Sequence, residues 1–158
     1  KDSYKITKFL HENKIAVMLN RLHDLPDLPE AETDIIYKTP YLLQKDSVLF
    51  CLQNQGDMEA MNARNISFLA GTSVAYGLTK EQALQSITLN SAKILGVDSL
   101  IGSIEVGKLA SIIVSDGDIL DIKTNHIILA FINGRPLKLA NFQNELYKKY
   151  ADKYGIKE

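Results

Sequence analysis

Two loops of this 158-residue chain carry side chains suited to acid–base chemistry or to binding a polar ligand. The first loop contains His23 and Asp24 and follows the apolar residues 15–19. An imidazole titrates close to neutral pH, so His23 can act as an acid or a base, or contact a substrate. The alternative interpretation is a loop histidine that hydrogen-bonds the neighbouring backbone.

The second loop follows the apolar residues 48–53 and begins with polar side chains, among them Asn54 and Asp57. Arg64 and Asn65 lie further along the same loop. A guanidinium group can donate two parallel hydrogen bonds to a carboxylate, so this pair is a candidate for binding a substrate carboxylate. The alternative is a solvated arginine beside an asparagine that caps the next helix.

Two apolar runs must position these loops. Residues 15–19 and 48–53 are apolar at nearly every position, which is typical of parallel strands that are buried on both faces. We expect the two strands to be adjacent and parallel, with a helix between them. Thr39 and Pro40 predict the start of that helix, as N-cap and first helical residue, and it should continue to Lys45. Both polar loops then lie at the carboxyl ends of neighbouring strands.

Helices are predicted after the second loop in the sequence. The spacing of apolar residues after position 65 predicts a helix that Gly77 terminates. Thr79 and Gln82 have the spacing of a capping box at the start of the next helix. Asn90 is expected to cap a shorter helix after that one. The same apolar spacing predicts a terminal helix over residues 142–150.

A β-rich segment follows these helices. Residues 102–116 read Gly-Ser-Ile-Glu-Val-Gly-Lys-Leu-Ala-Ser-Ile-Ile-Val-Ser-Asp, which is a glycine-bounded turn followed by a β-branched run. Residues 126–133 predict a second strand. Asn133 and Gly134 predict a tight turn with positive φ at both residues, followed by a short strand at 136–138. We expect these strands to form one sheet.

This β-rich segment resembles the C-terminal signature of the amidohydrolase superfamily. Residues 77–84 and 87–96 also resemble the preceding helix pair of imidazolonepropionase-like and dihydroorotase-like members. The resemblance implies an α/β fold. Residues 1–98 would form the C-terminal strands and helices of a metal-dependent hydrolase (β/α)8 TIM barrel, residues 99–138 part of the flanking composite β-sandwich, and residues 139–158 a C-terminal helix. A barrel takes roughly 250 residues, so we expect the C-terminal part of a longer protein.

The resemblance also implies a catalytic metal. In the superfamily a divalent, zinc-like metal activates the attacking water, held by a His-x-His motif, later histidines and an aspartate that ends the eighth strand. If residues 48–53 are that strand, the aspartate position falls at about Asn54, with Asp57 as the alternative; either can instead be a turn residue. His-x-His is absent and histidines stand only at positions 11, 23 and 126. A metal needs three or four ligands, so we expect no metal and no activity in this segment alone.

Three functional hypotheses follow. The resemblance favours a hydrolase that cleaves a non-peptide C–N bond, in an amide or cyclic amide, of a small-molecule substrate. The second hypothesis is a non-catalytic homologue that lost its metal site and serves as a binding or accessory protein, because Asn54 cannot act as a base. The third is a self-standing interaction module, against which the open edge of an incomplete barrel counts. Burying that edge and its apolar faces predicts a homo-oligomer.

Composition excludes other functions. A net charge of −1 and a pI near 6.4 give the chain no excess of positive charge with which to bind nucleic acid or an anionic membrane. No apolar run approaches the about 20 residues of a membrane-spanning helix. Cys51 is the only cysteine, so an internal disulfide is excluded, and its apolar surroundings predict a buried small side chain.

Overall fold

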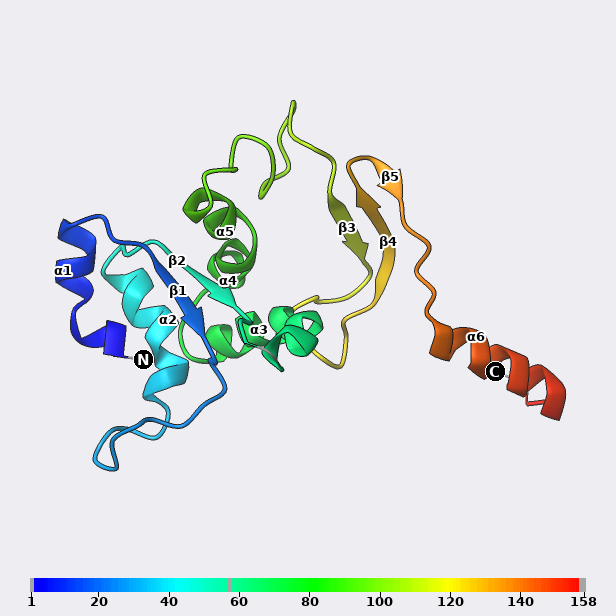
Figure 1. Cartoon of the computed structure of the whole chain (residues 1–158), viewed down its shortest axis with the longest axis horizontal. Coiled ribbons are helices and arrows are strands. Elements are labelled where there is room, and N and C mark those ends of the chain that lie inside the picture. Colours follow the sequence, from blue (N-terminus) through cyan, green and yellow to red (C-terminus); the bar gives the residue numbers. More distant parts are fainter. Residues whose placement is uncertain (1, 57, 157–158) are drawn as a thin grey trace.

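The two predicted strands form a parallel pair, as expected. A computed structural model describes residues 2–56 and 58–156. Strands β1 (Val17–Asn20) and β2 (Phe50–Gln53) pair in parallel, with Val17 opposite Phe50 and Asn20 opposite Gln53. Helix α2 (Ile35–Lys45) connects them, after η1 (Asp2–Lys5) and α1 (Thr7–Glu12) at the start of the chain (Figure 1). The carboxyl ends of both strands therefore point the same way.

The burial predicted for the first strand is wrong. Strand β1 begins at Val17, and its side chains alternate between half-buried and exposed, with Met18 47% exposed. Ile15, which precedes the strand, is also exposed. Phe50 on β2, in contrast, is completely buried. The difference arises because β2 is covered by helices, whereas one face and one edge of β1 are uncovered within the described residues.

Helix α2 begins earlier than predicted. It starts at Ile35, so Thr39 and Pro40 lie inside the helix rather than at its start. The Thr39 hydroxyl donates to the Ile35 carbonyl at 2.8 Å, and Pro40 is fully buried. A proline inside a helix removes one backbone hydrogen bond. Its buried ring contributes apolar contacts in the core that partly offset that loss.

Three helices cover β2 after the short η2 (Glu59–Asn65): α3 (Ile66–Ala75), α4 (Lys80–Ile87) and α5 (Leu89–Ile94). The capping box of Thr79 and Gln82 is confirmed. Gly77 follows α3 with a φ of 118°, as predicted for a residue past a helix end. The predicted Asn90 cap is wrong: this side chain lies inside α5 and donates to the Phe50 carbonyl of β2 at 3.0 Å.

The core lies between β2 and these helices. Its side chains come from β2, from helices α1 to α4 and the loops beside them, and from the segment after β3. They are Leu10, Leu22, Leu43, Val48, Phe50, Leu52, Leu69, Ala70, Leu78, Ala83 and Leu120. Leu120 reaches this core because its backbone crosses α3 closely. A Cβ built on Gly71 of α3 would lie 2.1 Å from the Leu120 carbonyl oxygen, so only glycine fits there.

The β-rich segment forms one antiparallel sheet, as predicted. Its order is β3 (Ile112–Ser115), β4 (Ile127–Ile132) and β5 (Arg135–Pro136). Asn133 and Gly134 have φ values of 50° and 76°, which is the tight turn expected. The last strand is shorter and begins one residue earlier than predicted.

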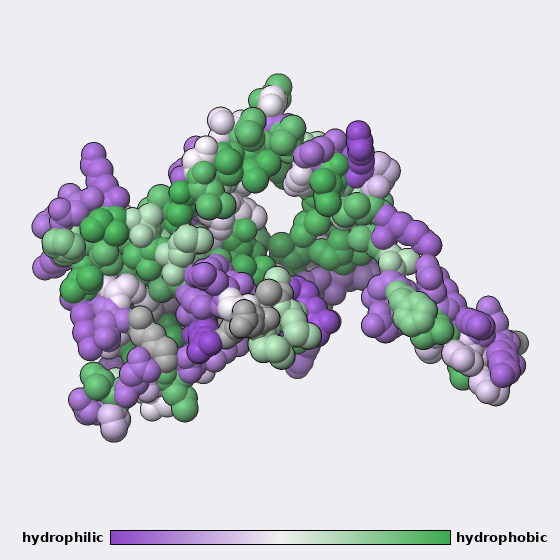
Figure 2. All heavy atoms as spheres, in the orientation of Figure 1, coloured by the Kyte–Doolittle hydropathy of each residue, from purple (hydrophilic) through white to green (hydrophobic). Residues whose placement is uncertain are grey.

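Much apolar surface of this segment is uncovered. Figure 2 shows hydrophobic side chains gathered over the sheet and the residues before it; among them Ile104 is 84% exposed and Leu129 51% exposed. Helix α6 (Phe142–Tyr154), capped by the Asn141 side chain, lies at the end of an extended segment (Figure 1). Among the residues that the structure describes, no helix has the length and apolar character to cross a membrane.

Candidate functional site

A polar pocket lies where β1 and β2 end. Its volume is about 390 Å³, and side chains from both strand ends and from the start of α3 line it: Arg21, Leu22, His23, Asp24, Asn54, Asn62, Asn65 and Leu69. Four residues singled out in the sequence, His23, Asp24, Asn54 and Asn65, thus share one pocket. Arg64 is exposed on η2 and does not line it, and Asp57 lies outside the described residues.

Asn20 joins the two strand ends. Its side-chain nitrogen donates to the Gln55 carbonyl at 3.1 Å, and its oxygen accepts from the backbone N–H groups of Arg21 and Gln55. Arg21 has a φ of 53°, which turns the chain sharply after β1. The sequence interpretation missed this role. A signal was present, because an asparagine directly after an apolar run favours a turn.

His23 is held by two helices. Its Nε2 lies 2.7 Å from Oγ1 of Thr72 on α3. The rings of His23 and Tyr37 of α2 lie edge to face, with centroids 5.9 Å apart and an interplanar angle of 80°. The ring of Tyr76 packs in turn against Tyr37, with centroids 5.3 Å apart. The expected alternative, a hydrogen bond to nearby backbone, is replaced by this bond to a side chain 49 residues away. The ring is exposed and positioned, as an acid or base must be.

The Asn54 side chain is half-buried and oriented. Its nitrogen donates to the Asn62 carbonyl at 3.1 Å, across the loop that follows β2. Asn65, for which a helix cap was the alternative interpretation, directly precedes α3 but makes no side-chain capping bond. Asp24 accepts a hydrogen bond from the Leu25 N–H at 2.9 Å. The pocket thus combines amide and imidazole groups with one cationic and one anionic side chain.

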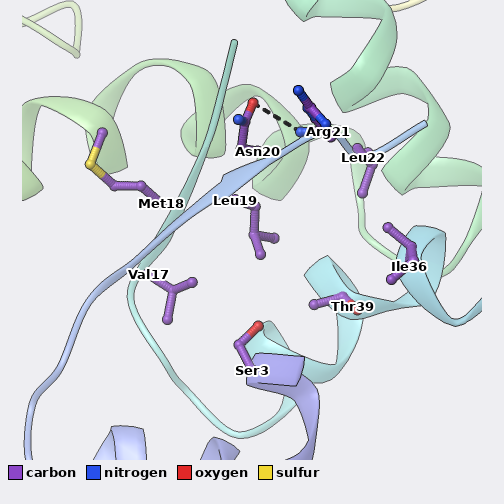
Figure 3. A pocket seen from close by; sticks show the side chains of 9 residues that line it. All are labelled: Ser3, Val17, Met18, Leu19, Asn20, Arg21, Leu22, Ile36 and Thr39. Carbon is purple, nitrogen blue, oxygen red and sulfur yellow. Dashed lines mark hydrogen bonds between the residues drawn. The ribbon is translucent and has the colours of Figure 1, made fainter. Parts of the chain in front are cut away.

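A second pocket lies beside β1 and is more apolar. It has a volume of about 320 Å³ and shares Arg21 and Leu22 with the polar pocket. Figure 3 shows Val17 and Leu19 pointing toward α2, whereas Met18 and Asn20 point to the other side. The Ser3 hydroxyl at its floor is buried without a hydrogen-bond partner. This pocket follows the uncovered side of β1 and gathers no titratable group except Arg21.

The described residues do not complete a metal site. No three His, Cys, Asp or Glu side chains come together in the part of the chain that the structure describes. His11 binds the Ser47 carbonyl at 3.1 Å, and His126 lies 3.5 Å from Asp116 beside the β3–β4 sheet, so neither joins His23. Cys51 is buried in the core, as predicted, and this burial raises the pKa of its thiol.

Comparison with known proteins identifies the family. Residues 31–147 match the model of the amidohydrolase family, and the chain belongs to this family. An amidohydrolase structure from Thermotoga maritima superposes with a TM-score of 0.74 at 34% identity, over 87% of this chain and 35% of that one. Three further solved chains with TM-scores of 0.60 to 0.65 are 19–21% identical and share the fold.

Curated relatives match over shorter segments. An adenine deaminase from Desulforamulus reducens is 30% identical over 93 residues, which are 59% of this chain and 15% of that protein. An imidazolonepropionase from Erwinia tasmaniensis is 33% identical over 85 residues, 54% of this chain and 19% of that protein. The chain thus matches less than a fifth of the length of either relative.

Proposed function

We propose that the chain is the C-terminal portion of a hydrolase that cleaves a non-peptide C–N bond in a small amide or cyclic amide. The observation that carries the proposal is the polar pocket at the carboxyl ends of β1 and β2, which collects His23, Asn54 and Asn65. Membership of the amidohydrolase family supports it, as do the names adenine deaminase and imidazolonepropionase, which denote reactions at C–N bonds.

We further propose that β1 and β2 are the last two strands of a (β/α)8 barrel. Parallel pairing with a helical connection supports this, as do polar side chains at the carboxyl ends, where barrel enzymes place their active sites. The exposed Met18 supports it too, because a further strand and the barrel interior would cover β1. The sheet of β3 to β5 would be part of the flanking sandwich.

Family members are generally metal-dependent. Because the described residues bring no three ligating side chains together, the divalent metal of the complete protein would be held mainly by side chains outside this chain. We propose that the 158-residue chain alone neither retains a stoichiometric metal nor hydrolyses amides.

The test is a hydrolysis assay on the complete polypeptide with a panel of amides and cyclic amides. The His23→Ala variant should lose at least about a hundredfold in kcat/KM, because general acid–base groups typically contribute about 10²- to 10⁴-fold. His11→Ala is the matched control, since His11 also makes one hydrogen bond, donated to the Ser47 carbonyl, but lies away from the pocket. No hydrolysis of any panel member, or equal effects of both variants, would refute the proposal.

One observation favours a second candidate function. Asn54 directly follows β2, where the resemblance implies an aspartate, and an amide cannot take up a proton as a carboxylate does. A homologue without its metal site, serving as a binding or accessory protein, would fit this residue. It predicts ligand binding by the complete polypeptide without turnover in the same assay.

A further inference from the structure

The turn between β4 and β5 contains the only asparagine of the chain that is followed by glycine, Asn133 before Gly134. An asparagine in this setting can lose its side-chain nitrogen without an enzyme, because the next peptide nitrogen can attack its side-chain carbon Cγ. Glycine hinders this attack least, since it has no side chain. Both residues of the turn are exposed, and a Cβ built on Gly134 would meet nothing within 4 Å. The turn therefore meets the chemical and steric conditions for deamidation.

The residues just before β3 hold this turn by hydrogen bonds. The Gly134 N–H donates to the Ala110 carbonyl at 2.8 Å. The Asn133 N–H donates to Oγ of Ser111 at 3.2 Å, and the Ser111 hydroxyl donates to Oδ1 of Asn133 at 3.4 Å. The attacking nitrogen must first lose its proton, and a carbonyl oxygen accepts a hydrogen bond without removing that proton. The Gly134 nitrogen is therefore kept protonated while the turn stays bound to Ala110.

We propose that Asn133 is a site of spontaneous deamidation and that the bonds to Ala110 and Ser111 keep the reaction slow in the folded chain. When the turn opens locally, the Gly134 nitrogen loses its proton and forms a bond to Cγ of Asn133. The bond between Cγ and Nδ2 breaks, and the side-chain nitrogen takes up a proton and leaves as ammonia. Water then opens the cyclic imide at either of its carbonyl groups, which yields aspartate or isoaspartate at position 133.

Isoaspartate would disturb the sheet, because its main chain runs through the former side chain and gains an extra carbon atom. The turn fixes the register of a hairpin, and here it sets Phe131 opposite Pro136. The Leu137 N–H, which donates to the Ala130 carbonyl at 2.8 Å, should therefore exchange its hydrogen faster in the isoaspartate form. An unchanged exchange rate would refute this consequence. The inference is independent of the proposed function, since no residue of the polar pocket takes part.

Peptide mapping by mass spectrometry, after incubation at mildly alkaline pH, measures the site and the rate of deamidation. Asn133 should react slowly in the folded 158-residue chain and at least about tenfold faster in guanidinium chloride, as for two hydrogen bonds opened together. Asn20 and Asn65, which precede an arginine and an isoleucine, should react more slowly than Asn133 in the denaturant. An Asn133 that stays intact in guanidinium chloride, or that reacts equally fast in the folded chain, would overturn the proposal.

Variants of Ser111 test whether the hydrogen bonds control the rate. Ser111→Ala should deamidate about fivefold faster at Asn133, as for one lost hydrogen bond of ordinary strength. Ser111→Thr keeps the hydroxyl and should restore the slow rate. Ser115→Ala is the matched control, because the Ser115 hydroxyl also bonds the main chain of this sheet, at the His126 carbonyl, but lies away from the turn. An unchanged or slower reaction in Ser111→Ala, or an equal increase in Ser115→Ala, would contradict the protective role of these bonds.

Discussion

Gly71→Ala tests how the β-rich segment is joined to the helices. In the structure an alanine Cβ would lie 2.1 Å from the Leu120 carbonyl oxygen, so the backbone after β3 must move away by at least 0.9 Å to reach 3.0 Å. Overpacking of this kind costs about 1–3 kcal/mol. Alanine is favoured over glycine inside a helix by about 1 kcal/mol. Because the clashing atom is a backbone oxygen, we take the upper part of the overpacking range, about 2–3 kcal/mol. The expected net loss is then about 1–2 kcal/mol, and about 2 kcal/mol more if the buried Leu120 leaves the core.

Urea unfolding followed by far-ultraviolet circular dichroism measures this change in the free energy of unfolding. Ala75→Gly provides a control for the glycine–alanine difference at the exposed last residue of the same helix, where that difference is smaller than in the interior. If Gly71→Ala were as stable as the unaltered chain or more so, helix propensity would outweigh the contact. The close crossing of α3 by the Leu120 backbone would then be refuted.

Three further predictions follow from other contacts. Asn90→Ala removes the donor to the buried Phe50 carbonyl and should cost about 1–3 kcal/mol in the same urea assay; an unchanged midpoint would contradict it. The Lys80 ammonium and then the Leu120 N–H hold the pKa of Asp118 below its ordinary value. Its contribution to stability is therefore present above the ordinary carboxyl pKa and lost as the pH falls through the lowered one, and Asp118→Asn should flatten this acid limb. Finally, light scattering after size exclusion should find the 158-residue chain self-associated through its exposed apolar faces, and a monomer at all concentrations would contradict this.

Local signals in the sequence predicted local structure well. The Asn133–Gly134 turn and the capping box of Thr79 and Gln82 depend on residues at most three apart, and both are present. The parallel pairing of β1 and β2 was also predictable, because two apolar runs with a helix between them favour that arrangement.

Predictions failed where a distant contact decides the outcome. A proline often marks the start of a helix, but the ring of Pro40 is buried in the core and the helix continues through this residue. Asn90 resembles a cap, yet its side chain binds a strand 40 residues away. The burial of β1 was overestimated because it depends on what covers the strand. The bond between His23 and Thr72 spans 49 residues, and no spacing rule connects them.

The metal content of the complete polypeptide tests the central claim most directly. The complete protein and the 158-residue chain should be purified under identical conditions without chelators and measured by inductively coupled plasma mass spectrometry. We expect stoichiometric divalent metal in the complete protein and none in the shorter chain, since its described residues bring no three ligating side chains together. A metal-free complete protein, or a shorter chain that holds the metal by itself, would contradict the assignment of this chain as the C-terminal part of a metal-dependent amidohydrolase.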